Sequence, residues 1–441
     1  MSYSAAIDQL NSMVPELHVP SGQPRRKFSL DEVRILLAAL GDPQRSFPSV
    51  LIAGTNGKGS TASTLASILT EAGYRTGLYT SPHLELPNER IRIDREEIDD
   101  DSFARHYFKA HDKAQELVLA GRLPQLPSYF ELLTSLAFLH FAEKEIEIAV
   151  LEVGMGGRLD ATNVVEPLVS IVTDISLDHT EWLGPTISAI TREKAGILRP
   201  KGTMITLPQH PEANQALGEV ATELAVHGVS AVPYMPPAAA RGSYSVEALG
   251  TAIEVNSPLH GAHQQRNIAL AIAAAVELSN HHGYRVSPSA IAQGVRLTRW
   301  PGRLERFEKD GVTWVLDVAH NPAGAWALRA GLRETLGEDS PRTLIFSCLR
   351  DKPAAEMAQI LFPLFEQIIV VPIRSARSAT IDELRAAART TGTPAVAAES
   401  VREAVKNARD RSASSAVVIS GSVYLVGEAR ALLLAADGES S

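Results

Sequence analysis

The sequence has a single cysteine, no excess of basic charge and no long apolar run. Cys348, the one cysteine among 441 residues, cannot form an intramolecular disulfide. Lysine and arginine number 42 against 51 aspartate and glutamate residues, which gives a net charge of -9, and no basic stripe stands out. Nucleic acid and anionic membranes are therefore poor partners for this chain, and a small-molecule substrate fits better.

Membrane and export signals are also missing from the sequence. The longest clearly apolar stretch, 268–276, is far shorter than the roughly 18 residues that suggest a membrane span. The first twenty residues contain no lysine or arginine that could form the basic start of a signal peptide. We therefore expect a cytoplasmic protein that has no membrane partner and is a monomer.

The composition is that of a globular protein, with 45% hydrophobic and 21% charged residues and a mean hydropathy of -0.02. At roughly 150 residues per domain, 441 residues suggest about three domains, or two if one is large. Short β-branched runs alternate with longer segments of helical spacing, a pattern typical of βαβ units and a parallel sheet. In the first part of the chain we expect strands at 49–54, 76–80, 146–153, 168–175 and 203–207 and helices at 60–72, 128–142, 187–198 and 264–279.

Two stretches interrupt this alternation. Prolines and alanines at 233–250 predict an insertion that forms a loop or a small irregular sheet. The Pro301-Gly302 pair then breaks the structure before a second alternating series begins. We therefore predict a larger parallel-sheet α/β domain at 1–298 and a smaller Rossmann-like α/β domain at 299–441. The second domain is expected to have strands at 312–317, 342–347, 367–371, 394–398 and 416–420 and a helix at 323–336.

A glycine-rich loop, 54–60, separates the first strand from its helix and reads Gly-Thr-Asn-Gly-Lys-Gly-Ser. Small residues let successive N–H groups surround phosphate oxygens, the helix N-terminus adds positive potential, and Lys58 supplies a charge. The hydroxyl of Ser60 or Thr61 could bind Mg²⁺. The loop therefore predicts that the domain at 1–298 is a parallel-sheet ATPase domain of the P-loop type. The loop is a variant of the Walker A motif, because Ile52 occupies the first glycine position and Gly59 follows the lysine. The alternative is a glycine-rich turn with a solvated lysine.

Polar residues also follow three further strands, where ligands bind in open α/β sheets. They are Ser81 in Thr-Ser-Pro-His, Glu152 before a glycine-rich segment, and His179 in Asp-His-Thr-Glu. Ser81 and Glu152 are candidate Mg²⁺ ligands, and His179 is a candidate metal ligand or phosphate contact. Each has a structural alternative: a Ser-Pro turn, a strand-end acid and a surface histidine. The segment after Glu152 is not a dinucleotide-binding fingerprint, because Leu159 stands where the last glycine is needed.

The second domain has its own strand-to-helix turn with polar residues, Asp317-Val-Ala-His320-Asn-Pro. This turn could contact ATP, or it could be an N-capping Asn-Pro turn before the helix. Lys194, by contrast, looks like a solvated helical lysine when its local sequence is taken alone.

Taken together, the order of these motifs resembles the Mur ligase superfamily and, within it, the folylpolyglutamate synthase and dihydrofolate synthase family. The similarity covers most of the chain. It is carried by the segments 54–60, 80–83, 88–91, 129–131, 151–163, 178–179, 193–196, 263–267, 301–303, 317–322 and 420–424. One departure is Val318, where the family usually has glycine, and a valine restricts that turn.

The resemblance implies an ATP-dependent ligase that adds L-glutamate to folates, to dihydropteroate or to both, through an acyl phosphate. It implies that Lys58, Lys194 and His320 are catalytic, and that two Mg²⁺ ions bind near Ser81, Glu152, His179 and a carbamylated Lys194. The implied ATP contacts are Gly54, Thr55, Asn56, Gly57, Lys58, Gly59, Ser60, Thr61, Asn267, Arg303 and Asp317. The implied contacts to the other substrates are Pro82, His83, Arg90, Asp160, Ala161, His320 and Ser422.

Two other functions remain possible from the sequence. One is a different Mur-type amino-acid ligase, against which the segments 81–83 and 88–90 argue because they match the folate enzymes. The other is a nucleotide switch that binds ATP without forming an amide. The motif at 317–322 argues against a switch, which has no evident need for it.

Overall fold

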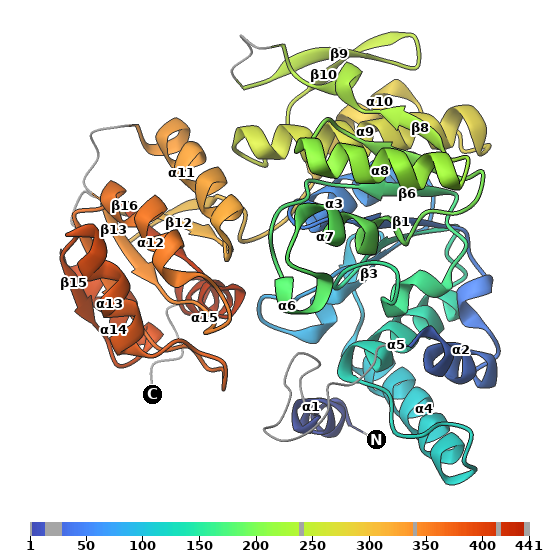
Figure 1. Ribbon diagram of the computed structural model, residues 1–441, viewed down its shortest axis with the longest axis horizontal. Helices are drawn as coiled ribbons and strands as arrows, with labels where there is room; N and C mark the ends of the chain where they lie inside the picture. The colour runs from blue at the N-terminus through green and yellow to red at the C-terminus, as the bar shows by residue number, and fades with distance from the viewer. Residues whose placement is uncertain (1, 14–28, 238–241, 338–341, 412–415, 436–441) are drawn as a thin grey trace. The chain divides into compact units, whose positions relative to one another are not determined.

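The computed structural model describes residues 2–13, 29–237, 242–337, 342–411 and 416–435 (Figure 1). The chain forms two compact units. The first comprises Met1–Ser81, Pro87–Ser257 and Arg266–Thr298, and the second comprises Pro82–Leu86, Pro258–Gln265 and Arg299–Ser441. Within the described residues, no helix is both long enough and apolar enough to cross a membrane.

The first unit is built on an eight-stranded sheet with the order β4-β3-β2-β5-β1-β6-β7-β8. Its strands are β1 (Ser49–Ala53), β2 (Thr76–Tyr79), β3 (Ile91–Ile93), β4 (Glu96–Glu97), β5 (Ile148–Glu152), β6 (Val169–Val172), β7 (Thr203–Thr206) and β8 (His227–Ser230). The run from β2 to β8 is parallel, as the alternating pattern predicts. The edge strands β3 and β4 are antiparallel. The segment 80–90 between β2 and β3 is too short to hold a helical crossover, which a parallel neighbour requires.

Helices cover both faces of this sheet, and β1 shows why its sequence is apolar from Val50 to Ala53. Val50 and Ile52 pack into a core with α3, α9 and α10, whereas Leu51 and Ala53 pack into a second core with α4 and α5. Successive strand residues point to opposite faces, so a central strand covered on both sides needs an apolar residue at every position. The α-helices are α1 (Tyr3–Ser12), α2 (Leu30–Ala39), α3 (Lys58–Glu71), α4 (Asp100–Leu119), α5 (Tyr129–Glu143), α6 (Thr180–Leu183), α7 (Ile187–Ala195), α8 (Pro211–Glu223), α9 (Ala262–His281) and α10 (Pro288–Leu297). Short 3-10 turns η1 (Pro43–Arg45), η2 (Pro87–Arg90), η3 (Ala161–Val164) and η4 (Val232–Tyr234) complete the unit.

The predicted insertion at 233–250 contains the start of a regular hairpin. β9 (Tyr244–Ala248) and β10 (Thr251–Val255) pair antiparallel, and alternate residues such as Val246 and Ile253 pack into the core that α9 and α10 share (Figure 1). This two-stranded sheet is more regular than the irregular one expected. Residues 238–241 lie outside the described residues.

The second unit holds a six-stranded sheet with the order β11-β12-β16-β13-β14-β15. Its strands are β11 (Glu305–Lys309), β12 (Val312–Asp317), β13 (Arg342–Phe346), β14 (Gln367–Val370), β15 (Ala395–Ala397) and β16 (Ala416–Ser420). All neighbours are parallel except β11, which forms an antiparallel edge hairpin with β12. Its helices are α11 (Pro322–Leu336), α12 (Ala354–Leu361), η5 (Phe362–Leu364), α13 (Ile381–Thr391), α14 (Val401–Arg411) and α15 (Val423–Leu434).

The boundaries of most predicted elements agree with the structure to within a few residues. The predicted helix at 187–198 is an exception, because α7 ends at Ala195. Gly196 follows as the C-cap, and the N–H groups of Ile197 and Leu198 donate to the carbonyl oxygens three residues back, of Lys194 and Ala195, so the α-helical pattern has ended.

Candidate active site

The glycine-rich loop joins β1 to the N-terminus of α3. Gly57 is the N-cap of α3 and has a positive φ of 90°. A Cβ atom built there would lie 2.2 Å from the Oδ1 atom of Asn267, on α9. Glycine is therefore required both by the backbone conformation and by the close packing of Asn267 against the loop.

The start of α3 provides hydrogen-bonding groups that the protein does not use. The first N–H groups of an α-helix have no acceptor within the helix, and the helix dipole makes this end attractive to anions. The side-chain hydroxyls of Ser60 and Thr61 are buried, and among the described residues neither has a hydrogen-bond partner. Buried polar groups are normally paired, so these two hydroxyls point to a ligand that supplies the missing partners.

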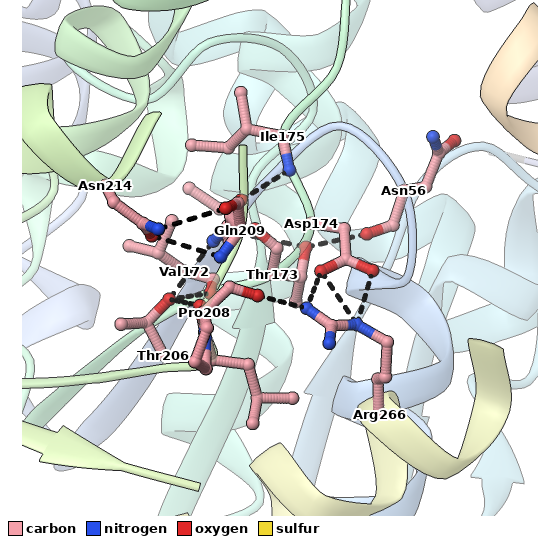
Figure 2. A network of polar contacts seen from close by, with 12 residues as sticks. Asn56, Val172, Thr173, Asp174, Ile175, Thr206, Pro208, Gln209, Asn214 and Arg266 are labelled. Atoms are coloured by element: carbon pink, nitrogen blue, oxygen red, sulfur yellow. Dashed lines mark hydrogen bonds and ion pairs between the residues drawn. The ribbon is translucent and has the colours of Figure 1, made fainter. Parts of the chain in front are cut away.

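The segment after β6 supports the other half of the loop. The carbonyl oxygen of Asp174 accepts hydrogen bonds from the backbone N–H groups of Thr55, at 2.9 Å, and Asn56, at 3.1 Å. The hydroxyl of Thr173 donates to the Asn56 carbonyl oxygen, and Figure 2 shows both residues in this network. The backbone N–H groups of Thr55 and Asn56 are thus bonded within the protein. The N–H groups at the start of α3 are the ones that can bind a phosphate.

Two lysines of the first unit converge on one carbonyl oxygen. The Nζ atom of Lys58 lies 3.2 Å from the Gly54 oxygen, and the Nζ atom of Lys194 lies 2.8 Å from the same atom. Lys194 is buried, so its sequence-based alternative, a solvated helical lysine, is wrong. Burial, and then repulsion by Lys58, lower the pKa of Lys194 to about 7, although Asp178 and Asp160 act in the opposite direction.

The loop after β5 fixes the position of Lys194 on α7. The N–H of Arg158 donates to the Glu193 carbonyl oxygen at 2.9 Å. A Cβ atom on Gly157 would lie 2.8 Å from the Lys194 carbonyl oxygen, so only glycine permits this approach. The glycine-rich segment after Glu152 therefore has a structural purpose, which is to pack against the end of α7.

Glu152 and Ser81 lie at the ends of the neighbouring strands β5 and β2. The Ser81 N–H donates to the Glu152 Oε2 atom at 3.1 Å, and the Glu152 side chain is only 4% exposed. His179 follows β6 in the left-handed region, with φ 50°, and Asp178 accepts a hydrogen bond from its N–H. The structure thus brings Ser81 and Glu152 together directly and places His179 at the end of the segment that continues from Asp174.

The donor atoms at these strand ends fit Mg²⁺, which prefers oxygen ligands and keeps several sites for water or phosphate. The donors on hand are the Glu152 carboxylate and the unpaired hydroxyls of Ser60 and Thr61. Over the described ranges, no three side chains of His, Cys, Asp or Glu form a group that could hold a metal ion. A metal here would therefore depend on other oxygen donors as well.

Asp160 accepts several hydrogen bonds inside the protein, and Arg90 lies against an aromatic ring. The Asp160 carboxylate accepts hydrogen bonds from the N–H groups of Met155 and Thr162, both at 3.0 Å, and from the Thr162 hydroxyl. Burial raises the pKa of Asp160. The buried guanidinium of Arg90 lies over the ring of Tyr129, with 5.4 Å between its central carbon and the ring centre. Ala161 is buried in the turn η3, which Asp160 caps.

In the second unit, the end of β12 forms a compact turn around Asp317. This buried carboxylate accepts hydrogen bonds from the Leu304 and Ala319 N–H groups, both at 2.9 Å. The pKa of Asp317 is raised, because the effect of burial exceeds the opposite effect of the Arg303 and His263 charges. The turn accommodates Val318 without a positive φ, and the Val318 N–H donates to the Gly302 carbonyl oxygen at 3.0 Å.

The remaining predicted residues of the second unit occupy turns and helix starts. Asn321 caps α11 by accepting the Gly324 N–H at 2.8 Å, so the capping alternative for this motif is realised. The His320 Nδ1 atom lies 2.9 Å from the Val318 carbonyl oxygen. Ser422 caps α15 through the Tyr424 N–H, at 3.2 Å.

Pro82 and His83 belong to a short strap, residues 82–86, which is part of the second unit. The strap is held by α15: the Arg430 Nη1 atom donates to Glu85 at 2.9 Å, and its Nε atom donates to Glu305 at 3.1 Å. Glu305 in turn accepts the Gly302 N–H at 2.9 Å. Arg430 therefore connects the strap to the turn that carries Arg303.

The predicted site residues fall into two groups, one on each unit. The first unit carries Gly54, Thr55, Asn56, Gly57, Lys58, Gly59, Ser60, Thr61, Ser81, Arg90, Glu152, Asp160, Ala161, His179, Lys194 and Asn267. The second unit carries Pro82, His83, Arg303, Asp317, His320 and Ser422. Sequence reasoning missed Asp174 and Arg266, whose side chains pair beside the phosphate loop. Their positions, just after a strand and just before Asn267, were the only signals available.

Two family models match the chain, the Mur ligase middle domain at residues 52–275 and the Mur ligase glutamate ligase domain at residues 302–423. The folylpolyglutamate synthase of Lacticaseibacillus casei is 33% identical over 446 aligned residues, covering 98% of this chain and 99% of the relative. The dihydrofolate synthase/folylpolyglutamate synthase of Mycobacterium tuberculosis is 34% identical, covering 92% of this chain and 90% of the relative.

Solved structures of the same enzymes are also similar to this chain. The folylpolyglutamate synthase of Mycobacterium tuberculosis, complexed with ADP and AMPPCP, has a TM-score of 0.86 at 32% identity and covers 99% of both chains. Escherichia coli FolC, in complex with DHPP and ADP, has a TM-score of 0.84 at 29% identity and covers 98% of this chain and 97% of that chain. The chain therefore belongs to the folylpolyglutamate synthase and dihydrofolate synthase family of Mur ligases.

Proposed function

We propose that this protein is an ATP-dependent ligase that joins L-glutamate to folates, to dihydropteroate or to both. The observation that carries the proposal is at the loop 54–60 and the start of α3: Lys58 and Lys194 share the Gly54 carbonyl oxygen, and the buried Ser60 and Thr61 hydroxyls have no partner among the described residues. This arrangement suits the phosphates of ATP, and it occurs in a chain that is similar along its whole length to folylpolyglutamate synthases.

ATP would bind to the first unit through the N–H groups at the start of α3 and through the charge of Lys58. Asn267 packs against Gly57 and would contact the nucleotide from α9. On the second unit, Arg303 and Asp317 are the proposed nucleotide contacts. The complexes of relatives with ADP and AMPPCP support this part of the proposal.

Magnesium ions would be held by Ser81, Glu152 and His179, with the Ser60 or Thr61 hydroxyl as a further oxygen donor. When bound, Mg²⁺ supplies positive charge that offsets the negative charge of the phosphates during phosphoryl transfer. Glu152 is suited to this place because its carboxylate is buried beside the loop and is oriented by the Ser81 N–H.

Lys194 would carry a carbamate, which converts a cationic side chain into an anionic oxygen ligand. A neutral amine attacks CO₂ and releases one proton, so the reaction requires the unprotonated lysine. A pKa of about 7 leaves a large neutral fraction near neutral pH, whereas an ordinary lysine is almost fully protonated there. Carbamylation would also remove the repulsion between Lys194 and Lys58.

The reaction proceeds in two steps, because a carboxylate is a poor acyl donor. The acceptor carboxylate attacks the γ-phosphorus of ATP, which gives an acyl phosphate and ADP. The amine of L-glutamate then attacks the acyl carbon, the amide forms, and inorganic phosphate leaves. Lys58 and Arg303 would stabilise the phosphoryl charge, and the protein acts mainly through positioning and electrostatics.

The remaining residues would contact the acceptor or the incoming glutamate. His320 and Ser422 are proposed to approach the glutamate. Pro82, His83, Arg90, Asp160 and Ala161 are proposed to contact the pterin-bearing substrate. The complex of Escherichia coli FolC with DHPP supports dihydropteroate-type compounds as one acceptor class.

The test is ATP- and Mg²⁺-dependent phosphate release with glutamate, comparing dihydropteroate with tetrahydrofolate and omitting each substrate in turn. Phosphate release that requires glutamate supports the proposal. Release with both acceptors would show a bifunctional enzyme, and release with only one acceptor would show a narrower activity. Lys58→Ala and Glu152→Gln should each abolish release while the protein stays folded. Wild-type turnover in either variant would contradict the site assignment, and ATP binding without release with either acceptor would favour another Mur-type ligase or a nucleotide switch.

A further inference from the structure

Beside the phosphate loop, α9 and the segment after β6 are joined by an ion pair that the proposed reaction does not use. The Arg266 Nε atom lies 3.1 Å and 2.9 Å from the two carboxylate oxygens of Asp174, and its Nη2 atom lies 2.6 Å from the first of them (Figure 2). Nη2 also donates to the Pro208 carbonyl oxygen at 3.0 Å. Because two nitrogens of one planar guanidinium bind the same carboxylate, this geometry fixes the orientation of the Arg266 guanidinium as well as its distance from Asp174.

The backbone of Asp174 is what connects this pair to the loop. Its carbonyl oxygen is the acceptor for the N–H groups of both Thr55 and Asn56. The loop is also tied to Ser176, whose N–H donates to the Thr55 hydroxyl at 3.1 Å, while that hydroxyl lies 3.1 Å from the Ser176 carbonyl oxygen. The position of the segment 173–176 therefore sets the position of the first half of the loop.

A second set of contacts holds the same segment from the other side. Gln209 accepts the Ile175 N–H at 2.8 Å, and its amide nitrogen donates to the Thr173 carbonyl oxygen at 3.1 Å. Asn214 fixes Gln209 in turn, through two hydrogen bonds of 3.0 Å with its backbone. Figure 2 shows Arg266 and Gln209 on opposite sides of this segment.

The residue after Arg266 on α9 is Asn267, which packs against Gly57. Two successive residues of one helix thus act on neighbouring residues of the loop, Arg266 through Asp174 on Thr55 and Asn56, and Asn267 directly on Gly57. We infer that the Asp174–Arg266 pair positions the phosphate loop against α9, and that Arg266 is a positioning residue for ATP. This inference rests on the proposed function, because it assigns ATP to that loop.

The pair contributes little to the stability of the fold. The Arg266 and Asp174 side chains are 27% and 39% exposed, and ion pairs of this exposure typically contribute about 1 kcal/mol or less. A small displacement of a phosphate-binding loop, however, can change function by orders of magnitude. Loss of the pair should therefore affect ATP binding far more than folding.

The experiment measures binding of a non-hydrolysable ATP analogue to the full-length protein by calorimetry, together with the thermal unfolding temperature. The variants are Arg266→Leu, Arg266→Lys, Asp174→Ala and the double variant Arg266→Leu/Asp174→Ala. Arg105→Leu is the matched control, since Arg105 forms a comparable two-pronged pair with Glu143 between α4 and α5. Steady-state kinetics then separate the KM for ATP from kcat and from the KM for glutamate.

We expect Arg266→Leu to weaken analogue binding roughly tenfold and to raise the KM for ATP, with kcat and the KM for glutamate changed less than threefold. The affinity of Arg266→Lys for the analogue should lie between those of wild type and Arg266→Leu, because lysine cannot hold both carboxylate oxygens. The double variant should bind the analogue no more weakly than either single variant. Binding within twofold of wild type in Arg266→Leu, or an equal loss in Arg105→Leu, would overturn the inference. If the wild-type protein itself does not bind the analogue, the proposed function fails instead.

Discussion

Lys194 is the single residue whose chemistry depends most on the fold. Burial and the nearby charge of Lys58 lower its pKa to about 7, and its Nζ atom lies 2.8 Å from the Gly54 carbonyl oxygen. A lysine in this state can react with CO₂, whereas an exposed one is almost always protonated. Its sequence gives no local sign of this, since a lysine between Glu193 and Ala195 on a helix is an ordinary surface pattern.

We predict that Lys194→Ala lowers ligation at least a hundredfold and that a short-chain carboxylic acid restores part of the activity. The small acid would occupy the space left by the side chain and supply the anionic oxygen that a carbamate provides. The measurement is the rate of ATP-dependent ligation against acetate or propionate concentration. Lys194→Arg serves as the control, because its bulk leaves no room, and full activity in either variant without added acid would contradict the role.

A pair of buried histidines lies between α4 and α5 in the first unit. His106 on α4 and His140 on α5 are 2% and 4% exposed, and their ring centres are 5.6 Å apart. Burial lowers the pKa of each to about 4. The unfolded chain, with ordinary histidine pKa values near 6.5, therefore binds protons at a higher pH than the folded protein does.

The consequence is a loss of stability in mild acid. As the pH falls through 6.5 toward 4, the free energy of unfolding should drop by roughly 1–2 kcal/mol per histidine between pH 7 and pH 5. Urea unfolding at several pH values measures this drop. The double variant His106→Leu/His140→Leu should flatten the profile, while exposed His227→Gln should leave it unchanged; an unaltered profile in the double variant would contradict the explanation.

Among the elements, the loop and the first turn of α3 show why a glycine is required at Gly57. An added Cβ would meet the Asn267 Oδ1 atom at 2.2 Å, and the residue also has a φ of 90°. Gly73, at the other end of α3, has the same φ of 90° but nothing within 4 Å of an added Cβ. The two positions therefore separate backbone strain from contact with Asn267.

We predict that Gly57→Ala removes detectable ATP binding, whereas Gly73→Ala retains it. Both variants should lose about 1 kcal/mol or more of stability from the positive φ, because alanine disfavours that conformation. Calorimetric titration with nucleotide, alongside thermal unfolding, distinguishes the two effects. Equal loss of binding in both variants would mean that the contact with Asn267 has no part in holding the loop.

The strap at 82–86 makes a similarly close contact with α15. A Cβ atom on Gly427 would lie 2.0 Å from the Leu84 carbonyl oxygen, one turn of helix from Arg430, which binds Glu85. Gly218 on α8 has nothing within 4 Å of an added Cβ. The helix α15 thus needs glycine at Gly427 for packing, while α8 does not need it at Gly218.

Gly427→Ala should therefore destabilise the protein by roughly 1–3 kcal/mol, because the strap or the helix must move. Gly218→Ala should be neutral or stabilising by up to about 1 kcal/mol, because alanine is the better helix former. Chemical unfolding of the two variants checks this difference. The contact is refuted if Gly427→Ala is as stable as Gly218→Ala.

For the whole molecule, the sequence predicted the class of both sheets, and the elements that it predicted best are those with strong local patterns. Continuous apolar runs such as 50–53 and the helical spacing in α3 depend only on neighbouring residues, so they are visible in the sequence. The strand order is not, because β5 lies between β2 and β1 although it follows both in the chain. Sheet order depends on contacts between distant segments.

The same distinction applies to the candidate site. Motif residues such as Lys58 and Glu152 could be selected because they follow strands, where α/β proteins place their ligands. Asp174 and Arg266 are 92 positions apart, and Glu85 and Arg430 are 345 apart, so neither pair leaves a pattern in the sequence. These pairs position the motif residues, and only the folded chain brings them together.

We propose above that the protein forms an amide through an acyl phosphate of its folate-type acceptor. The most direct measurement uses an acceptor whose carboxylate carries heavy oxygen, with ATP, Mg²⁺ and L-glutamate, and analyses the released phosphate by mass spectrometry. Because the oxygen that bridges carbon and phosphorus comes from the acceptor carboxylate, we expect one heavy oxygen atom in inorganic phosphate for each amide formed. Amide formation with unlabelled phosphate, or phosphate release without any amide, would contradict this proposal.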